Sequence, residues 1–212
     1  MRLTKPLNLH ELDYISRNIL AKIISRDFPR SHAKSPQIAS LPCQSPAFSL
    51  FSWAMNTQEQ DIKFIRQAIE VARKAREKGN EPFGAILVDA DGNRVLESEN
   101  TITTERDCTG HAEAGLMRKA TKAYDADFLA GCTLYTSTEP CPMCAGAIFW
   151  GNVRRVVYGL SEQGLYDIIG TDSEEVLFLP CREVFERGRK PIEVIGPLLE
   201  DEAREVHAGF WD

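Results

Sequence analysis

The chain has 212 residues, of which 43% are hydrophobic and 26% are charged. This length can supply one domain with a substantial buried core, and no apolar run reaches the roughly 20 residues that a membrane-spanning helix needs. The formal net charge of −6 argues against a large phosphate-binding face, and six cysteines in a chain of this length do not indicate a disulfide-stabilised scaffold. We therefore expect a cytoplasmic globular protein without a membrane partner.

The N-terminal quarter of the chain differs in composition from the rest. Residues 1–54 carry seven Lys/Arg against three acidic residues, whereas residues 55–212 carry 18 against 28, a net charge of −10. Apolar residues recur at helical spacing from Leu9 to Ile24, and a Pro/Ser-rich stretch follows. Two interpretations stay open: a presequence for organelle import, which is typically amphipathic and basic, and an extension upstream of a functional start at Met55. In both, residues 1–54 lie outside the main folded domain, which we expect to span residues 55–212.

The rest of the chain alternates between helix and strand patterns. An Asn-x-x-Glu capping pattern at Asn56 predicts the start of a helix with an apolar stripe, and Gly79 predicts its end. Asp91-Gly92 predicts a hairpin turn between two strands. Further helices are expected at 111–123, 140–150 and 198–208, and strands at 85–88, 94–99, 132–137, 154–159 and 192–195. This alternation predicts a three-layer α/β domain with a mixed sheet.

Two short motifs combine metal ligands with a free carboxylate. His111-Ala112-Glu113 precedes the run Pro-Cys-Pro-Met-Cys at residues 140–144. Zinc binds Cys sulfur and His nitrogen well, and a catalytic zinc keeps one position open for water, whose pKa falls to about 7. His111, Cys141 and Cys144 supply three ligands, and Glu113 can move the protons of that water. The order H-x-E…P-C-x-x-C is typical of zinc deaminases.

Other interpretations of the cysteine motif stay open at this point. A Cys-x-x-Cys pair also suits a redox centre or half of a closed structural zinc site. A closed site needs a fourth ligand, which Cys108, Cys132 or Cys181 could supply. The two motifs occur together and in order, with a strand-like segment between them, and this favours the catalytic interpretation.

The stretch from Phe64 to Val157 resembles the cytidine deaminase superfamily, in the branch of guanine, cytosine and tRNA adenosine deaminases. The resemblance is carried by PFGAILV (82–88), Asn100, GHAEAGLMRKA (110–120) and TLYTSTEPCPMCAGAI (133–148). It implies a three-layer α/β/α fold with a mixed five-stranded sheet and Zn²⁺ between two central helices. It also implies His111, Cys141 and Cys144 as zinc ligands, Glu113 as the proton shuttle, and a homodimer with its sites near the interface.

Substrate contacts follow from the same resemblance. It implies that Asn100 bonds the base or sugar, that Phe83 lines the pocket and that the backbone carbonyl of Glu139 accepts a bond from the amine. Asn100 could instead be a turn residue. At the C-terminus we expect Trp211 to cover the planar base and the carboxylate of Asp212 to meet its amine, the alternatives being a loose tail or plain packing.

The sequence predicts a zinc-dependent deaminase that releases ammonia from a free nucleobase or nucleoside, guanine-like or cytosine-like, by attack of zinc-bound hydroxide. A tRNA-specific adenosine deaminase shares these catalytic residues, but the acidic domain and the C-terminal run LLEDEARE disfavour tRNA as a partner. A non-catalytic zinc-binding partner subunit is the third alternative, against which Glu113 argues. Asp107-Cys108-Thr109-Gly110 departs from the sequence that many purine-directed members of this superfamily have before the His. The run after Gly159 matches no branch of the superfamily, so more than one base stays possible as the substrate.

Overall fold

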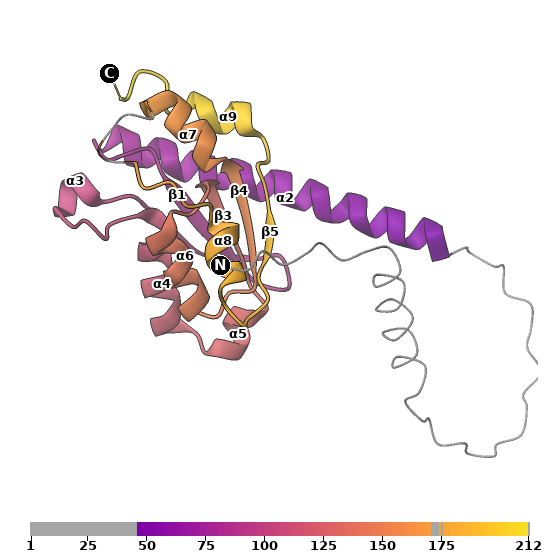
Figure 1. Ribbon diagram of the computed structural model, residues 1–212. Helices are drawn as coiled ribbons and strands as arrows, with labels where there is room; N and C mark the ends of the chain where they lie inside the picture. The colour runs from indigo at the N-terminus through magenta and orange to yellow at the C-terminus, as the bar shows by residue number, and fades with distance from the viewer. Residues whose placement is uncertain (1–45, 171–173, 175, 212) are drawn as a thin grey trace, which may run out of the picture. The chain divides into compact units, whose positions relative to one another are not determined.

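The computed structural model describes residues 46–170, 174 and 176–211 (Figure 1). Most of the N-terminal extension and the predicted substrate contact Asp212 therefore lie outside the described residues. Within the described part of the chain, no helix is both long and apolar enough to cross a membrane.

Five strands form one mixed sheet in the order β2-β1-β3-β4-β5. β1 (Gly84–Val88) pairs antiparallel with both β2 (Arg94–Glu99) and β3 (Thr133–Thr138). β4 (Arg155–Leu160) lies parallel to β3 and to the edge strand β5 (Glu193–Ile195). The predicted five-stranded mixed sheet is confirmed.

Helices cover both faces of this sheet, because the central strands alternate apolar side chains between the two faces. Ala85 and Leu87 of β1 pack in one core, and Ile86 and Val88 pack in the other. The first core is shared with α4 (Ala112–Ala123), α6 (Pro142–Trp150) and α8 (Cys181–Glu186), and the second with α2 (Pro46–Glu77), α7 (Glu162–Ile169) and α9 (Glu200–Glu205). Figure 1 shows these two helical layers on either side of the strands. The short helices α3 (Ile102–Glu105) and α5 (Ala126–Ala130) lie in connections.

The first helix begins ten residues earlier than the capping pattern predicts. α2 starts at Pro46, where proline suits a first helical turn, so Asn56 lies inside the helix and the prediction of an N-cap there is wrong. No further proline or glycine interrupts the helix before its end. The predicted stop at Gly79 is confirmed: its φ is +82°, and the N–H of Asn80 donates to the carbonyl of Ala75 at 3.0 Å, as in a Schellman motif.

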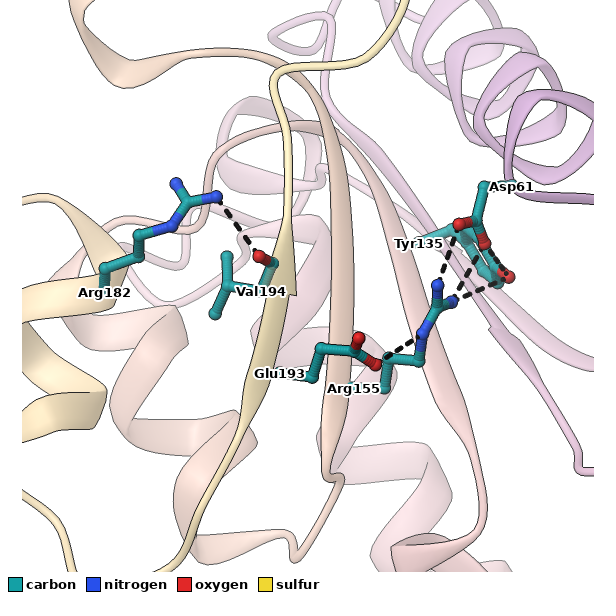
Figure 2. A network of polar contacts seen from close by, with 6 residues as sticks. All are labelled: Asp61, Tyr135, Arg155, Arg182, Glu193 and Val194. Carbon is teal, nitrogen blue, oxygen red and sulfur yellow. Dashed lines mark hydrogen bonds and ion pairs between the residues drawn. The ribbon is translucent and has the colours of Figure 1, made fainter. Parts of the chain in front are cut away.

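A polar network at one end of the sheet fastens α2 to three strands (Figure 2). Asp61 of α2 accepts hydrogen bonds from two nitrogens of Arg155, at 2.9 and 2.8 Å, and from the hydroxyl of Tyr135 at 2.8 Å. Arg155 also donates to Glu193 at 2.9 Å. Asp61 is buried and Arg155 is partly buried, so the loss of either partner would leave the other charge poorly solvated. This network therefore fixes the helix on the sheet.

We propose that residues 1–54 are dispensable for catalysis. The buried side chains of α2 that the structure describes begin at Asp61, so a chain of residues 55–212 keeps all of them and shortens the helix by its first nine residues. We expect kcat/KM within about twofold of the full chain, because changes away from packed groups usually shift free energies by no more than about 0.5 kcal/mol. An insoluble or inactive 55–212 chain beside an active full chain would show that the extension belongs to the domain.

Candidate active site

Two metal-ligand candidates occupy the N-caps of neighbouring helices on one face of the sheet. His111 is the N-cap of α4 and Cys141 is the N-cap of α6, both with extended backbone, and neither side chain makes a capping hydrogen bond. The helix predicted at 140–150 would begin with Pro140; the structure instead begins α6 at Pro142, in the position that proline favours. Because neither side chain bonds to the backbone of its own helix, both are available to a metal.

The ligand atoms of His111, Cys141 and Cys144 all lie within 4.8 Å of one another. The Nδ1 atom of His111 lies 3.5 Å from the Sγ atom of Cys141. Tetrahedral zinc with bonds of about 2.3 Å to sulfur and about 2.1 Å to nitrogen separates two such ligands by about 3.6 Å, so this spacing fits one ion. Among the residues that the structure describes, no fourth His, Cys, Asp or Glu joins the cluster, which argues against a closed structural site.

The two clustered thiols differ in acidity. A hydrogen bond from Cys144, and then one with His111, lowers the pKa of Cys141 to about 4. The same thiol–thiol bond, together with burial, raises the pKa of Cys144. The partial positive charge at a helix N-terminus further favours thiolate. One sulfur is thus ready to ligate a metal, and the second loses its proton when a metal binds.

Glu113 lies in the first turn of α4 and is nearly buried, with 6% of its surface exposed. Thr136 of β3 donates a hydrogen bond to its Oε1 atom at 2.9 Å. Burial, and then the neighbouring Cys141 sulfur, raises the pKa of Glu113, so the carboxyl holds a proton more readily than an exposed glutamate does. General acid–base catalysis needs a group that both takes up and releases a proton, and a buried carboxyl of this kind is suited to it.

Thr136 was not among the site residues predicted from the sequence. The signal that could have found it is strand alternation, which turns Thr136 to the same face as Leu134, the face that α4 covers.

Asn100 is fully buried at the end of β2 and organises a turn. Its Oδ1 atom accepts from the N–H of Ile102 at 3.0 Å, and its Nδ2 atom donates to Glu81 at 3.1 Å. Its backbone N–H donates to the carbonyl of Phe83 at 3.0 Å. A carboxamide has two donor hydrogens and two acceptor lone pairs, so these bonds leave capacity for a substrate. The turn role is observed, and the contact with a base stays a prediction.

The C-terminal tail packs beside the predicted pocket wall. The indole N–H of Trp211 donates to Nδ1 of His207 at 3.2 Å. The ring of Phe83 lies 5.3 Å from that of His207 and 6.2 Å from that of Trp211. These contacts argue against a loose tail. They place Trp211 next to Phe83, and its role as a lid over a bound base stays a prediction.

The side chain of Glu139 has a role that the sequence did not indicate. It is buried, and its two oxygens accept hydrogen bonds from the backbone N–H groups of Glu162, at 3.1 Å, and Cys181, at 3.0 Å. Glu162 is itself buried, and burial together with the nearby Glu139 carboxylate raises its pKa to about 7. The thiol of Cys181 has a raised pKa through burial and then Glu139. Neither α7 nor α8 was expected, because both helices are short.

The fold and this site define a deaminase of the cytidine-deaminase-like fold: a mixed sheet presents a His/Cys/Cys cluster at two helix N-termini, beside a buried carboxyl. The family model described as the cytidine and deoxycytidylate deaminase zinc-binding region matches residues 58–160. The chain belongs to this deaminase family, whose members are hydrolytic enzymes.

Similar proteins act on different substrates. The chain is 43% identical over 155 residues to a probable cytosine deaminase of Schizosaccharomyces pombe, covering 73% of this chain and 94% of that one. It is 36% identical over 152 residues to a tRNA-specific adenosine deaminase of Bacillus subtilis, covering 72% and 89%. A solved structure of a protein in complex with 2,6-diaminopurine has a TM-score of 0.60 at 26% identity, covering 71% of this chain and 80% of that chain.

Proposed function

We propose that this protein is a zinc-dependent hydrolase that releases ammonia from a free nucleobase or nucleoside. The observation that carries the proposal is the buried carboxyl of Glu113 beside the three-ligand cluster, with its Oε1 atom held by Thr136. A structural metal site has no use for a proton-transferring group at this place. Hydrolytic deamination needs one, because water must lose protons and the departing amine must gain them.

His111, Cys141 and Cys144 would hold the zinc. When bound, zinc would lower the pKa of a water ligand to about 7. Glu113 would then take the proton of the attacking water, deliver it to a ring nitrogen and afterwards help to protonate the leaving amine. The exchange consumes one water and releases one ammonia, and the ring keeps a carbonyl where the amine was. Thr136 would hold the carboxylate in place between these steps.

The charge of the domain supports a small substrate. Residues 55–212 carry a net charge of −10, and a face that follows an RNA backbone would need basic side chains. The similarity to a probable cytosine deaminase over most of that protein's length supports a free base as the substrate. The similar structure bound to 2,6-diaminopurine makes an aminated purine a second candidate base. The similarity to a tRNA-specific adenosine deaminase makes tRNA the second substrate to test.

A screen for ammonia release would test the proposal. Purified full-length protein would be supplied with cytosine, guanine, related aminated bases, nucleosides, pterins and tRNA. We expect turnover of at least one free base or nucleoside and none of tRNA. Inosine formation in tRNA without turnover of any small molecule would contradict the proposed substrate class.

A second copy of this chain is the partner that we propose, and α6 is its contact surface. The helix sequence PMCAGAIFW contains no charged side chain, yet Met143 is 38% exposed and Trp150 80% exposed. Gly146 lies between them in sequence, and a side chain added there would meet open space. These positions form one apolar stripe along the helix, where a solvent-facing helix would be polar. Twofold pairing through one self-complementary patch is the commonest way to cover such a face.

Sedimentation equilibrium tests this partner. We expect the parent to have twice the chain mass of 23.8 kDa, and Trp150→Glu to have the single mass, because the charge cannot be buried at an apolar contact. Leu177→Glu, a matched change of an exposed apolar residue outside α6, should leave the dimer intact. A monomeric parent would contradict the proposal.

Deleting residues 210–212 tests the predicted lid. If Trp211 covers the base beside Phe83, we expect kcat/KM to fall at least about tenfold with little change in thermal stability, because an open pocket admits water. Trp211→Phe keeps an aromatic ring but loses the bond to His207 and part of the ring area, so its kcat/KM should fall less than that of the deletion. Unchanged kinetics would remove the lid, and equal losses of activity and stability would indicate plain packing.

A further inference from the structure

The residue just before the second metal motif, Glu139, joins several elements of the fold. It follows the last residue of β3, and its backbone N–H donates to the carbonyl of Leu160 at 2.8 Å, in the register of the parallel pairing of β3 with β4. Pro140 and then the metal-ligand candidate Cys141 come directly after it. The path of the backbone at Glu139 therefore decides where Cys141 lies.

The carboxylate of Glu139 binds two helix N-termini at once. Its Oε2 atom accepts from the N–H of Glu162, the first residue of α7, at 3.1 Å. Its Oε1 atom accepts from the N–H of Cys181, the first residue of α8, at 3.0 Å. The first N–H groups of a helix have no acceptor within the helix and carry partial positive charge, so a buried carboxylate satisfies them well.

These two helices belong to opposite layers. Leu165 of α7 packs in the core that α2 covers, whereas Phe185 of α8 packs in the core that α4 and α6 cover. The chain between the helices also packs onto the first of them, since the rings of Tyr166 and Phe178 lie 5.9 Å apart. The Glu139 carboxylate thus ties both layers, at the carboxyl end of β3, to the segment that carries Cys141.

α8 has a separate anchor at the edge of the sheet, which Figure 2 shows in part. Arg182 donates to the carbonyls of Val194, at 3.2 Å, and Gly196, at 3.0 Å, and to the hydroxyl of Tyr158 at 2.6 Å. The helix is therefore already held on the sheet without Glu139. The bond from Cys181 to Glu139 adds a link from this helix to the metal segment.

We propose that Glu139 is a positioning residue, whose carboxylate couples α7 and α8 to the segment bearing Cys141 and so fixes the substrate side of the site. The proposal rests on the proposed deaminase function and deepens it. The carboxylate would hold the backbone carbonyl of Glu139 where it can accept the bond from the substrate amine. The helices that it holds would form the pocket side on which bases with different exocyclic groups are distinguished.

Glu139→Gln is the sharpest test of this coupling. A carboxamide keeps one acceptor oxygen but turns an NH2 donor toward a backbone N–H donor, so one of the two bonds is lost. We expect one zinc per chain, as in the parent, and kcat/KM at least about tenfold lower. We also expect a smaller ratio of kcat/KM between the preferred base and a base with a different exocyclic group. Glu139→Asp keeps the charge, is shorter by one methylene and should recover part of the loss.

A control of similar structural cost separates positioning from plain stability. Tyr135 lies on β3, the strand that precedes Glu139. Tyr135→Phe removes its bond to Asp61 of α2, in the network at the other end of the sheet (Figure 2). Measured well below both melting temperatures, Tyr135→Phe should keep the parent's kcat/KM and substrate ratio. The proposal would be overturned if Glu139→Gln had the same kinetics as Tyr135→Phe and differed from the parent only in a lower melting temperature.

Hydrogen exchange keeps the inference testable if no base is turned over. In the zinc-loaded full chain, the amides of Glu162 and Cys181 should exchange at least about tenfold faster in Glu139→Gln than in the parent, because a bond to a charged acceptor is lost. The Tyr135→Phe protein should show no change there. An inactive parent with this exchange pattern would refute the deaminase proposal but not the coupling, whereas equal exchange in all three proteins would refute the coupling.

Discussion

Glu113→Gln is expected to lower kcat by about 10²–10⁴-fold, which is the usual contribution of a general acid–base group. The zinc content should stay unchanged. Gln matches the shape of Glu and can still accept the bond from Thr136, but it cannot take up and release protons. One carboxyl here would serve several proton transfers, so the loss should lie toward the upper end of that range. Steady-state kinetics and metal analysis of the same sample measure both quantities.

The matched control is Glu105→Gln, the same substitution at an exposed position of α3. It should leave kcat unchanged. Turnover by Glu113→Gln within a few-fold of the parent would contradict the assigned role. A loss of zinc in Glu113→Gln would show that the carboxyl acts as a ligand.

Cys144→Ala is expected to abolish both stoichiometric zinc binding and turnover. Cys144 is fully buried in the first turn of α6, and no other side chain of the described residues can replace its sulfur in the cluster. Without the metal the pKa of the attacking water is not lowered to about 7, so kcat should fall by at least about 10³-fold. Metal analysis after dialysis, together with ammonia release, measures the effect.

Cysteines outside the cluster supply the controls. Cys108 is exposed, and Cys132 is buried and donates a hydrogen bond from its thiol to the carbonyl of Phe128. Neither belongs to the cluster of metal-ligand candidates. Cys108→Ala and Cys132→Ala should each keep one zinc per chain. An empty site in either variant would indicate a different ligand set, and a fully active, metal-free Cys144→Ala would refute the zinc mechanism.

The metal ligands could be predicted from sequence because their geometry is local. Cys141 and Cys144 are three residues apart in one helical turn, and His111 and Glu113 also lie within one turn, so each motif brings its side chains together. The stop at Gly79 was predictable for the same reason, since the positive φ belongs to the glycine itself.

Contacts between distant residues were not predictable. The partner of Glu113 is Thr136, 23 residues away, and the donors to Glu139 lie 23 and 42 residues further along the chain. Only the register of the strands and the packing of the layers bring these groups together. α7 and α8 have eight and six residues, too few for periodicity to reveal. Ser161 caps α7 locally, but the carboxylate that joins the first turns of both helices comes from elsewhere in the fold. The start of α2 was misplaced because the capping pattern at Asn56 lies inside a longer helix.

Isotope labelling of the product tests the central claim, hydrolytic deamination at the His/Cys/Cys cluster, most directly. The zinc-loaded full chain would be incubated in H₂¹⁸O with each base or nucleoside that releases ammonia, and the product would be analysed by mass spectrometry. The account predicts one ¹⁸O atom in the deaminated base or nucleoside for each ammonia released. The zinc-free chain should release no ammonia and form no labelled base or nucleoside. Ammonia release without ¹⁸O in the product, or undiminished turnover by the zinc-free chain, would contradict it.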